Sequence, residues 1–436
     1  MKIGIRKEER GKWEARAPLI PEHVRLLKED YSIHTIVQSS PYRIFTDDEY
    51  RKAGATVVTD LKDAQIIFGV KEISGSALEP QKTYIFFSHT SKGQKYNMPM
   101  LQKILDLGCN LIDYERIVDD KGRRIIFFGR YAGLAGMINS LWTLGKRISY
   151  EGITDHFSKI KRAYEYHSLE EAKQSLKTIG DGIRVGGLPN DLTPLVCGIT
   201  GYGNVSKGAQ EILDCFPLIE IEPEQLPKLG AQIPVSRNHL YKVVFKEEHL
   251  VKPRDPGAKF SLQDYYHHPE KYISQFSHYL PFLTMVVNCI YWEPRYPRLI
   301  TRKALQELSQ KQSHPRLRVI GDISCDIEGS VEVTVKTTNP ESPAYIYDPY
   351  EDSFRDEITG RGIAVMARDN LPCELPRDSS YAFSLQLLKF VPKIVQAHAN
   401  NKLDKNALPG LIQKALIVYR GKLTEDYEYL ASFIAP

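Results

Sequence analysis

The sequence predicts an α/β protein with two Rossmann-like domains, whose parallel sheets flank an active-site cleft. Three observations predict this fold class. Short apolar strand-like runs alternate with helical segments over residues 1–130, and a second alternating unit starts near Leu195. In that second unit, Gly201 and Gly203 stand between a strand-like run and a helix. Strands that alternate with helices form parallel sheets, and ligands bind such sheets beyond the carboxyl ends of the strands.

The elements of the first 130 residues follow from hydrophobic periodicity and from helix-end residues. Pro21 suits the first turn of a helix over residues 21–30, and Gly108 ends an amphipathic helix that starts at Met98. The predicted strands of this segment are Lys2–Arg6, Ile33–Gln38, Ile66–Val70, Thr83–Ser88 and Asn110–Tyr114.

The rest of the chain begins with a predicted helix over residues 131–150, whose small residues would let another backbone approach closely. We expect this helix to link the two domains. Residues 246–280 form an irregular insertion. Further strands are predicted at 195–200, 218–221, 241–245, 285–290, 318–323, 345–347 and 362–367, and further helices at 169–178, 381–398 and 407–419.

Composition excludes several classes of protein. The 436 residues are 42% hydrophobic and 26% charged, which is ordinary globular usage and not that of a disordered, collagen-like or coiled-coil chain. The net charge of +4 is small for an electrostatic nucleic-acid binder. No apolar run approaches the ~18 residues that span a bilayer. We therefore expect neither nucleic acid nor a membrane as a partner.

Cysteine usage and the N-terminus bear on metals and location. The 6 cysteines are scattered without a Cys-x-x-Cys pair, and the chain has no His-Glu-x-x-His or Gly-x-Ser-x-Gly motif. We expect no metal. The first ten residues lack the apolar core of a signal peptide and carry too many acids for a transit peptide. We expect a cytoplasmic location.

The segment from residue 201 to residue 222 carries the cofactor signal. The glycines permit a tight turn and let the backbone approach a pyrophosphate at the helix N-terminus. Ser206 replaces the usual third glycine, although Gly208 follows. Glu222 lies at about the ~20-residue offset where an acid can bind the adenine ribose, which favours NAD. A plain strand–turn–helix and a surface acid are the alternatives. The predicted cofactor-binding residues of this segment are Gly201, Gly203, Asn204, Val205 and Glu222.

Several blocks, in order, resemble the alanine dehydrogenase/transhydrogenase superfamily, in the branch that contains saccharopine dehydrogenases. Two further blocks, Tyr266–Phe276 and Asn288–Glu293, resemble the lysine–ketoglutarate reductase half of the aminoadipate-semialdehyde synthases of animals and plants. The resemblance runs from about residue 2 to about residue 390. The superfamily blocks are Trp13–Leu19, Phe68–Glu72, Phe86–Gln94, Leu111–Glu115, Tyr131–Gly136, Gly201–Ala209, Gly321–Asp326 and Asp369–Pro376.

This resemblance implies a reductase that condenses the ε-amine of L-lysine with 2-oxoglutarate and reduces the imine to L-saccharopine. It implies a substrate-binding domain of residues 1–130 plus 331–436 and a dinucleotide-binding domain of residues 131–330. A separate saccharopine-cleaving dehydrogenase is then a candidate partner, and a homodimer is a candidate assembly.

Lys71 and His89 match the acid–base pair of the saccharopine dehydrogenases. The hypothesis is that one deprotonates the amine, while the other exchanges protons with the carbonyl and carbinolamine oxygen. Lys71 can act as a base near neutrality only if burial or neighbouring cations lower its pKa. A solvated surface lysine and a hydrogen-bonded strand-end histidine are the structural alternatives.

Further residues in or beside the matched blocks are candidates for binding substrate. Arg16, Lys92 and Arg124 would clamp carboxylates, although Arg124 could equally belong to a basic hairpin turn. Glu14 and Glu115 would position the lysine amine or form structural ion pairs. Glu72 is expected to face away from Lys71, by strand alternation, unless the strand has already ended. 

The identity of the cofactor stays open between NADP(H) and NAD(H). The reductases that this chain resembles prefer NADPH, so NADP(H) is preferred here and NAD(H) is the alternative. Arg237 is a candidate cation for the 2′-phosphate of NADPH. By the same resemblance, Ile290 and Asp322 lie at strand ends that meet the nicotinamide riboside.

Three other functions compete with this interpretation. The first is an alanine-type amino-acid dehydrogenase, and the second is an NAD-dependent, lysine-forming saccharopine dehydrogenase. The third is a catalytically silent nucleotide-binding regulator, against which the presence of both Lys71 and His89 argues.

Overall fold

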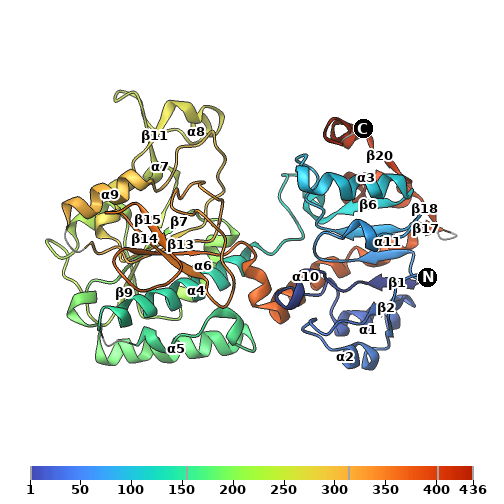
Figure 1. The fold of residues 1–436 in the computed structure, drawn as a ribbon, viewed down its shortest axis with the longest axis horizontal. Coiled ribbons are helices and arrows are strands. Elements are labelled where there is room, and N and C mark those ends of the chain that lie inside the picture. The colour runs from blue at the N-terminus through green and yellow to red at the C-terminus, as the bar shows by residue number, and fades with distance from the viewer. Residues whose placement is uncertain (1, 154–155, 313–314, 400–401, 435–436) are drawn as a thin grey trace. The chain divides into compact units, whose positions relative to one another are not determined.

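The computed structural model describes residues 2–153, 156–312, 315–399 and 402–434. The chain forms two compact units (Figure 1). The N-terminal unit comprises residues 1–128 and 376–436, and the central unit comprises residues 129–375. The sequence predicts that residues 331–375 belong with the N-terminal segment. The structure places them in the central unit, because β14 (Ala344–Asp348) and β16 (Ile363–Ala367) are hydrogen-bonded into its sheet.

The N-terminal unit is built on an eight-stranded sheet with the order β20-β19-β6-β5-β4-β1-β2-β3. Its strands β1 to β6 are parallel, which confirms the parallel sheet predicted from alternating strands and helices. The strands are β1 (Lys2–Ile5), β2 (His34–Gln38), β3 (Thr56–Val58), β4 (Ile66–Phe68), β5 (Thr83–Phe86), β6 (Asn110–Asp113), β19 (Leu416–Tyr419) and β20 (Lys422–Leu423).

Helices cover this sheet, and local sequence explains their ends. Pro21 starts α1, and Thr46 caps α2 by accepting a hydrogen bond from the Glu49 backbone. The hydroxyl of Ser380 in α10 accepts a hydrogen bond from the Ala17 backbone, so the C-terminal segment packs onto the N-terminal one. The helices are α1 (Pro21–Tyr31), α2 (Asp47–Lys52), α3 (Met98–Asp106), α10 (Pro376–Leu388), α11 (Val391–Gln396) and α12 (Gly410–Lys414).

Residues 407–419 differ from the helix that the sequence predicts. Only the short α12 is helical there, and Leu416–Tyr419 form β19, which pairs antiparallel with β6. The branched Ile417 and Val418 favour a strand, and the long-range partner decides in favour of pairing.

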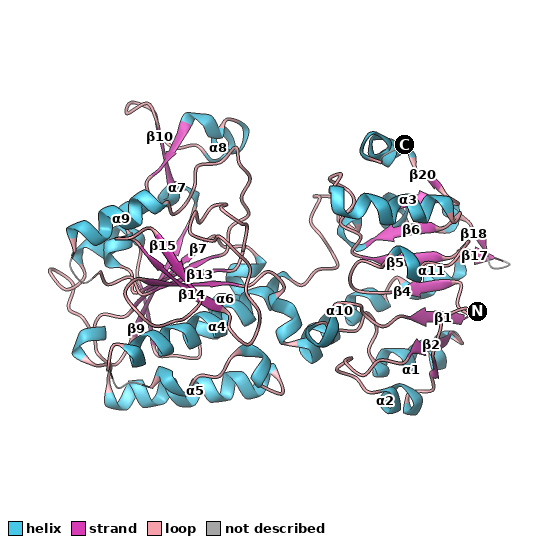
Figure 2. Ribbon diagram, in the orientation of Figure 1, coloured by secondary structure: helices cyan, strands magenta, loops and turns pink. Residues whose placement is uncertain are grey.

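The central unit has a second eight-stranded sheet, ordered β15-β14-β16-β13-β12-β7-β9-β8. Strands β8, β9, β7, β12, β13 and β16 are parallel, while β14 and β15 (Ser353–Arg355) are antiparallel additions. Figure 2 shows α4, α5 and α6 on one side of this sheet and α9 on the other. The remaining elements are β7 (Val196–Thr200), β8 (Leu218–Glu220), β9 (Leu240–Phe245), β12 (Met285–Asn288), β13 (Val319–Asp322), α4 (Gly129–Tyr150), α5 (Leu169–Gly186), α6 (Asn204–Leu213) and α9 (Arg302–Lys311).

Close contact between α4 and α6 explains the small residues of α4. A Cβ atom on Gly133 would lie 1.9 Å from the carbonyl oxygen of Val205, and one on Gly208 would lie 2.1 Å from that of Arg130. Gly208 therefore provides the close helix approach, although it stands two positions beyond the usual third glycine.

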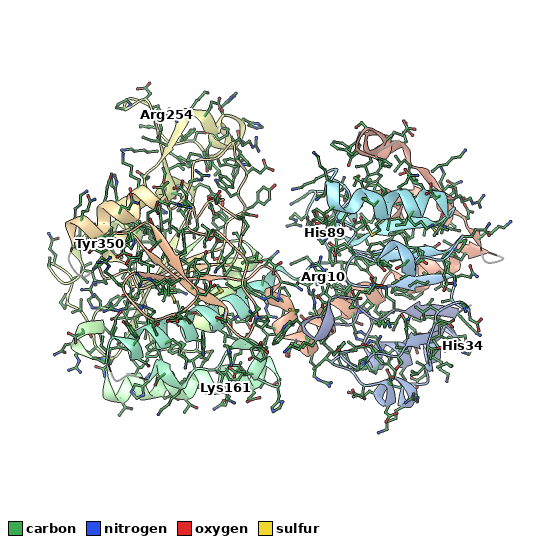
Figure 3. All side chains as sticks on the ribbon, viewed as in Figure 1. Arg10, His34, His89, Lys161, Arg254 and Tyr350 are labelled. Atoms are coloured by element: carbon green, nitrogen blue, oxygen red, sulfur yellow. The ribbon has the colours of Figure 1, made fainter. Side chains whose placement is uncertain are left out.

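The predicted insertion at residues 246–280 contains short elements after β9. They are α7 (Glu247–Leu250), β10 (Val251–Pro253), α8 (Leu262–His267) and β11 (Tyr272–Ser274). β10 and β11 pair antiparallel, and Arg254, labelled in Figure 3, donates a hydrogen bond to the Glu270 carbonyl at 2.8 Å. Among the described residues, no helix combines the length and apolarity that a membrane span requires.

Candidate active site

The N-terminal unit gathers its predicted catalytic residues at one edge of the sheet. Lys71 follows the end of β4, His89 follows β5 and Glu115 follows β6. These strands are parallel neighbours, so the three residues leave the sheet at the same edge. Figure 3 shows Arg10 and His89 on one side of this unit, opposite His34, which starts β2. The pair predicted from sequence therefore occupies adjacent loops.

Lys71 is half-buried, and Glu8 fixes its backbone. The two carboxylate oxygens of Glu8 accept hydrogen bonds from the backbone N–H groups of Val70 at 2.8 Å and Lys71 at 2.9 Å. Burial lowers the pKa of the Lys71 ammonium and the charge of Arg16 lowers it further, whereas Glu72 raises it. A lowered pKa increases the fraction of neutral amine, which is the form that can accept a proton.

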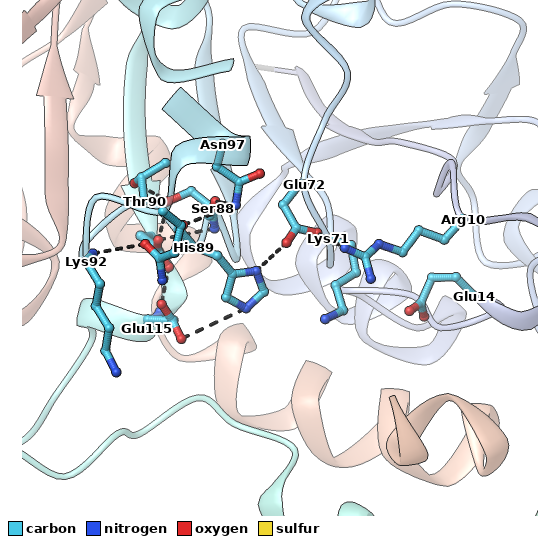
Figure 4. A network of polar contacts seen from close by, with 12 residues as sticks. Arg10, Glu14, Lys71, Glu72, Ser88, His89, Thr90, Lys92, Asn97 and Glu115 are labelled. Carbon is cyan, nitrogen blue, oxygen red and sulfur yellow. Dashed lines mark hydrogen bonds and ion pairs between the residues drawn. The ribbon is translucent and has the colours of Figure 1, made fainter. Parts of the chain in front are cut away.

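Glu72 and His89 form the central hydrogen bond of this site (Figure 4). Glu72 Oε1 contacts His89 Nδ1, and Glu72 Oε2 accepts a hydrogen bond from Arg10 Nη2 at 2.9 Å. Burial acts to raise the pKa of Glu72, but the hydrogen bond and charge of His89, with help from Arg10, lower that pKa to about 2. When Nδ1 of His89 carries the hydrogen, Nε2 is left for proton exchange. It lies 4.0 Å from Glu115 Oε1.

The backbone around His89 is held in an uncommon conformation. His89 has a φ of 47°, in the left-handed region, where backbone strain often accompanies a functional role. The Asn97 amide donates hydrogen bonds to the carbonyls of Ser88 at 3.0 Å and His89 at 3.1 Å. The buried Asp113 accepts a hydrogen bond from the Ser88 backbone at 3.2 Å. Burial, followed by the charge of Glu115, raises the pKa of Asp113 to about 6.

For Glu72, the structure meets the exception that the sequence leaves open, namely that the strand has already ended. Strand alternation turns Glu72 away from Lys71, but β4 ends at Phe68, so the alternation no longer applies at residue 72. The sequence does not predict Glu8 and Arg10 as site residues. They lie in a polar N-terminal segment that carries no family motif, and only the fold brings them to β4.

Arg16 and Glu14 form a buried, two-bond ion pair. Arg16 Nε and Nη2 donate to the two carboxylate oxygens of Glu14 at 2.7 and 2.6 Å, and each side chain is 1% exposed. The Arg16 guanidinium also lies 4.3 Å from the ring centre of Phe128. This contact is the structural ion pair that the sequence allows as an alternative for Glu14. A role for either residue in binding substrate stays a prediction.

Arg124 and Glu115 form a second ion pair, at 2.9 Å. Arg124 follows a tight turn in which Asp119 accepts hydrogen bonds from the backbone and side chain of Arg123, so the hairpin alternative is confirmed. This does not exclude a clamp, because the Arg124 side chain is 51% exposed. Lys92 is exposed in the loop after β5 (Figure 4), and its role in binding substrate stays a prediction.

In the central unit, the residues from 201 to 205 have the geometry that a dinucleotide needs. Gly201 has a φ of 80°, which a side chain would strain, and Gly203 caps α6. A Cβ atom on Gly203 would meet nothing within 4 Å, so the backbone is open to a ligand there. Asn204 and Val205 begin α6 and present their backbone N–H groups at its N-terminus. These residues fit a pyrophosphate.

Asp322 occupies the predicted strand end but is 1% exposed. Its carboxylate accepts hydrogen bonds from Asn288 at 2.9 Å and Thr334 at 2.6 Å, and burial raises its pKa to about 6. Asp322 therefore ties the ends of β12 and β13 together. Ile290 lies just beyond β12, and its methyl group would be 3.1 Å from a Cβ atom on Gly201. Ile290 is thus beside the glycine loop, as a cofactor contact would require.

The strand that precedes Glu222 is not next to the glycine-loop strand, although the sequence offset of Glu222 implies that it should be. In the usual order, the strand after the glycine-loop helix lies next to the glycine-loop strand. Here β9 lies between β7 and β8, so Glu222 follows the outermost strand. Two strand spacings, ~10 Å, then separate β8 from β7. Glu222 itself is exposed at the start of a short 3-10 helix.

Arg237 is excluded as the cation for a 2′-phosphate at this edge. It precedes β9, and its Nε donates to the Leu188 carbonyl at 2.9 Å. Gly201 follows the carboxyl end of the parallel strand β7. Arg237 therefore lies at the amino edge of the sheet, opposite the glycine loop.

Comparison with known proteins identifies the family. The alanine dehydrogenase/PNT N-terminal domain matches residues 4–135, and the alanine dehydrogenase/PNT C-terminal domain matches residues 285–426. A solved structure of L-alanine dehydrogenase has a TM-score of 0.62 and 17% identity, and the match covers 100% of both chains. That likeness confirms the fold. Proteins of this family use a nicotinamide cofactor.

Two curated relatives refine this placement. Alpha-aminoadipic semialdehyde synthase of Arabidopsis thaliana is 39% identical over 445 residues, which cover 98% of this chain and 41% of that protein. Saccharopine dehydrogenase (NAD(+), L-lysine-forming) of Neurospora crassa is 26% identical over 392 residues, which cover 86% of each. The chain spans less than half the length of the aminoadipic semialdehyde synthases that it matches. The chain belongs to the alanine dehydrogenase/PNT family and is related to the reductase part of alpha-aminoadipic semialdehyde synthase.

Proposed function

We propose that this protein is a lysine–2-oxoglutarate reductase, which forms L-saccharopine and uses NADPH as its preferred reductant. The observation that carries the proposal is the arrangement of Lys71, Glu72, His89 and Glu115 on three adjacent strand ends. A proton acceptor and a proton donor are what imine formation from an amine and a keto acid requires, and the two carboxylates lie against His89. The relationship to aminoadipic semialdehyde synthase supports the choice of lysine and 2-oxoglutarate.

In this proposal, Lys71 begins the reaction as a neutral amine. Its lowered pKa allows Nζ to take a proton from the ε-ammonium of the substrate lysine, which can then attack the keto carbon of 2-oxoglutarate. His89 Nε2 gives a proton to the carbinolamine oxygen, which leaves as water. Glu72 holds Nδ1 of His89 and stabilises the charged ring between these transfers.

Gly201, Gly203 and the start of α6 would hold the nicotinamide cofactor, which would supply the hydride for reduction of the imine. Arg16, Lys92 and Arg124 are the proposed contacts for the substrate carboxylates, and Glu14 and Glu115 the proposed contacts for the lysine amino groups. Arg16 and Arg124 would each exchange a glutamate partner for a substrate carboxylate.

The decisive assay is oxidation of NADPH in the presence of lysine and 2-oxoglutarate, with each substrate omitted in turn. Lys71→Met and His89→Gln should each reduce kcat by roughly 10²–10⁴-fold. Both should leave NADPH binding unchanged, because the glycine loop belongs to the other unit. Lys62→Met is the matched control, since Lys62 is 76% exposed in the same unit. Full activity in the Lys71→Met, His89→Gln double variant would rule the proposal out.

One alternative has a specific observation behind it. The saccharopine dehydrogenase of Neurospora crassa matches 86% of this chain, and its name states NAD(+) and formation of lysine. For that function, NAD(+) reduction with saccharopine would exceed NADPH oxidation with lysine and 2-oxoglutarate when both are measured at the same pH.

A further inference from the structure

Residues at the end of the strand next to the glycine loop are expected to determine cofactor selectivity in this chain. β7 pairs with β9 on one side and with β12 on the other. A dinucleotide bound at the end of β7 would therefore extend one half over β9 and the other half over β12. Ile290 lies beyond β12, on the side where the nicotinamide half is expected. The adenosine half is then expected beyond β9.

The register of β9 brings Lys246 beside the glycine loop. Thr200 pairs with Phe245, and the Gly201 backbone N–H donates to the Phe245 carbonyl at 2.8 Å. Lys246 is the next residue after Phe245, and it is exposed. Glu220 pairs with Lys242, so Glu222 is level with residue 244, two residues short of Lys246. In this sheet, Lys246 has the place that an acid usually takes at the end of the neighbouring strand.

The adjacent acid, Glu247, is already engaged. Its Oε1 accepts hydrogen bonds from the hydroxyls of Tyr266 at 2.6 Å and Tyr202 at 3.4 Å. Tyr202 stands between the two loop glycines, and Tyr266 comes from α8 of the insertion. The insertion thereby supplies a hydroxyl group that donates a hydrogen bond to Glu247, the first acid after the end of β9. A carboxylate held by two hydroxyls is a poorer acceptor for a ribose 2′-hydroxyl, which is the contact that favours NADH.

We propose that Lys246 selects NADPH over NADH by contacting the 2′-phosphate, and that Tyr202 and Tyr266 hold Glu247 away from that position. The assignment depends on the proposed function only in requiring that a nicotinamide dinucleotide binds. A phosphate of about two negative charges needs a cation at this point. An ammonium supplies it, whereas the sequence-predicted Glu222 would repel it.

The test measures binding of each cofactor to the full chain, without substrates, by titration calorimetry. Wild-type protein should bind NADPH more tightly than NADH. Lys246→Ala should weaken NADPH by about tenfold or more and leave NADH nearly unchanged, because the hydrogen bond lost is one to a charged group. Lys246→Arg should preserve the preference, and Lys246→Glu should reverse it. Lys252→Ala, at an exposed lysine of β10, is the matched control.

Two further variants separate the competing explanations. Tyr266→Phe should improve NADH binding by freeing Glu247, and it should weaken NADPH binding. If Glu222→Gln shifts the preference while Lys246→Ala does not, the outer strand selects the cofactor and the proposal is overturned. Equal losses for both cofactors in Lys246→Ala, or a wild-type preference for NADH, would also overturn it. Selective binding without NADPH oxidation by lysine and 2-oxoglutarate would instead refute the proposed function alone.

Discussion

Replacing Glu72 by glutamine tests whether the His89 contact organises the N-terminal site. The pKa of Glu72 falls from an ordinary 4.5 to about 2 in the folded protein. At ~1.4 kcal/mol per pKa unit, the folded state favours this carboxylate by about 3 kcal/mol. The side chain is 13% exposed, so solvent screening removes little of this. A glutamine side chain has the same shape but is uncharged and has only one oxygen. It therefore cannot accept charge-assisted hydrogen bonds from both His89 and Arg10.

The sign of the pH dependence follows from a lowered pKa. The stabilisation by Glu72 is complete above pH 4.5 and is lost as the pH falls through about 2. Wild-type protein should therefore lose about 3 kcal/mol more stability than Glu72→Gln between pH 5 and pH 2. Hydrogen exchange of the β4 and β5 backbone amides reports on the opening of this unit by itself.

The activity of the same variant provides a second readout. Because His89 loses the partner that holds Nδ1, kcat at neutral pH should fall by about tenfold to a hundredfold, the worth of one hydrogen bond to a charged group. Glu29→Gln, at an exposed position on α1, should change neither quantity. The reasoning is refuted if Glu72→Gln and wild type lose stability in parallel as the pH falls and turn over substrate at the same rate.

Three other substitutions give clear expectations. Gly133→Ala should lower the melting temperature, because its Cβ would lie 1.9 Å from a backbone oxygen of α6 and overpacking costs about 1–3 kcal/mol. Lys82→Met should destabilise the N-terminal unit in urea unfolding, since the buried ammonium donates to three backbone carbonyls at 2.7 to 2.9 Å that methionine would leave unpaired. Glu14→Gln should shift the acidic limb of the pH profile of kcat/KM to lower pH. Its carboxylate raises the pKa of Lys71, and its loss also leaves the charge of Arg16 uncancelled.

Much of the fold could be predicted because its strands are short apolar runs with local signals. The runs at residues 66–68, 83–86 and 110–113 become parallel strands, and Pro21 starts a helix as expected. The order of the strands in the sheet could not be predicted from local sequence patterns. β9 enters the sheet between β7 and β8 through the pairing of Val196 with Tyr241 and of Leu218 with Leu240, which are 45 and 22 residues apart, and no local pattern encodes that choice. The offset argument for Glu222 assumes a strand order that this sheet does not have, so its contact with the ribose stays a prediction. Arg237 precedes β9 and therefore lies at the opposite edge from the glycine loop.

The candidate site shows the same division between local and long-range information. Family motifs identify Lys71 and His89, and parallel strands then bring them to one edge. Glu8 and Arg10 come from a segment without a motif, and they reach the site because β1 pairs with β4. Their contribution is visible only in contacts such as the hydrogen bond from the Lys71 backbone to Glu8.

The charge pattern of the N-terminal site explains how one set of residues can be both structural and substrate-binding. Each of three arginines is paired with a glutamate: Arg10 with Glu72, Arg16 with Glu14, and Arg124 with Glu115. Arg16 is 1% exposed, and a buried arginine without an acid costs several kcal/mol, so this residue needs an internal partner whenever it holds no ligand. Arg10 and Arg124 are 46% and 51% exposed, so their ion pairs are worth less. The proposed substrates bring three carboxylates and two amines. Exchange of partners would give two substrate carboxylates to Arg16 and Arg124. The two amino groups of lysine would go to Glu14 and Glu115, while Arg10 keeps Glu72. The ion pairs seen here are therefore compatible with a clamp role for Arg16 and Arg124.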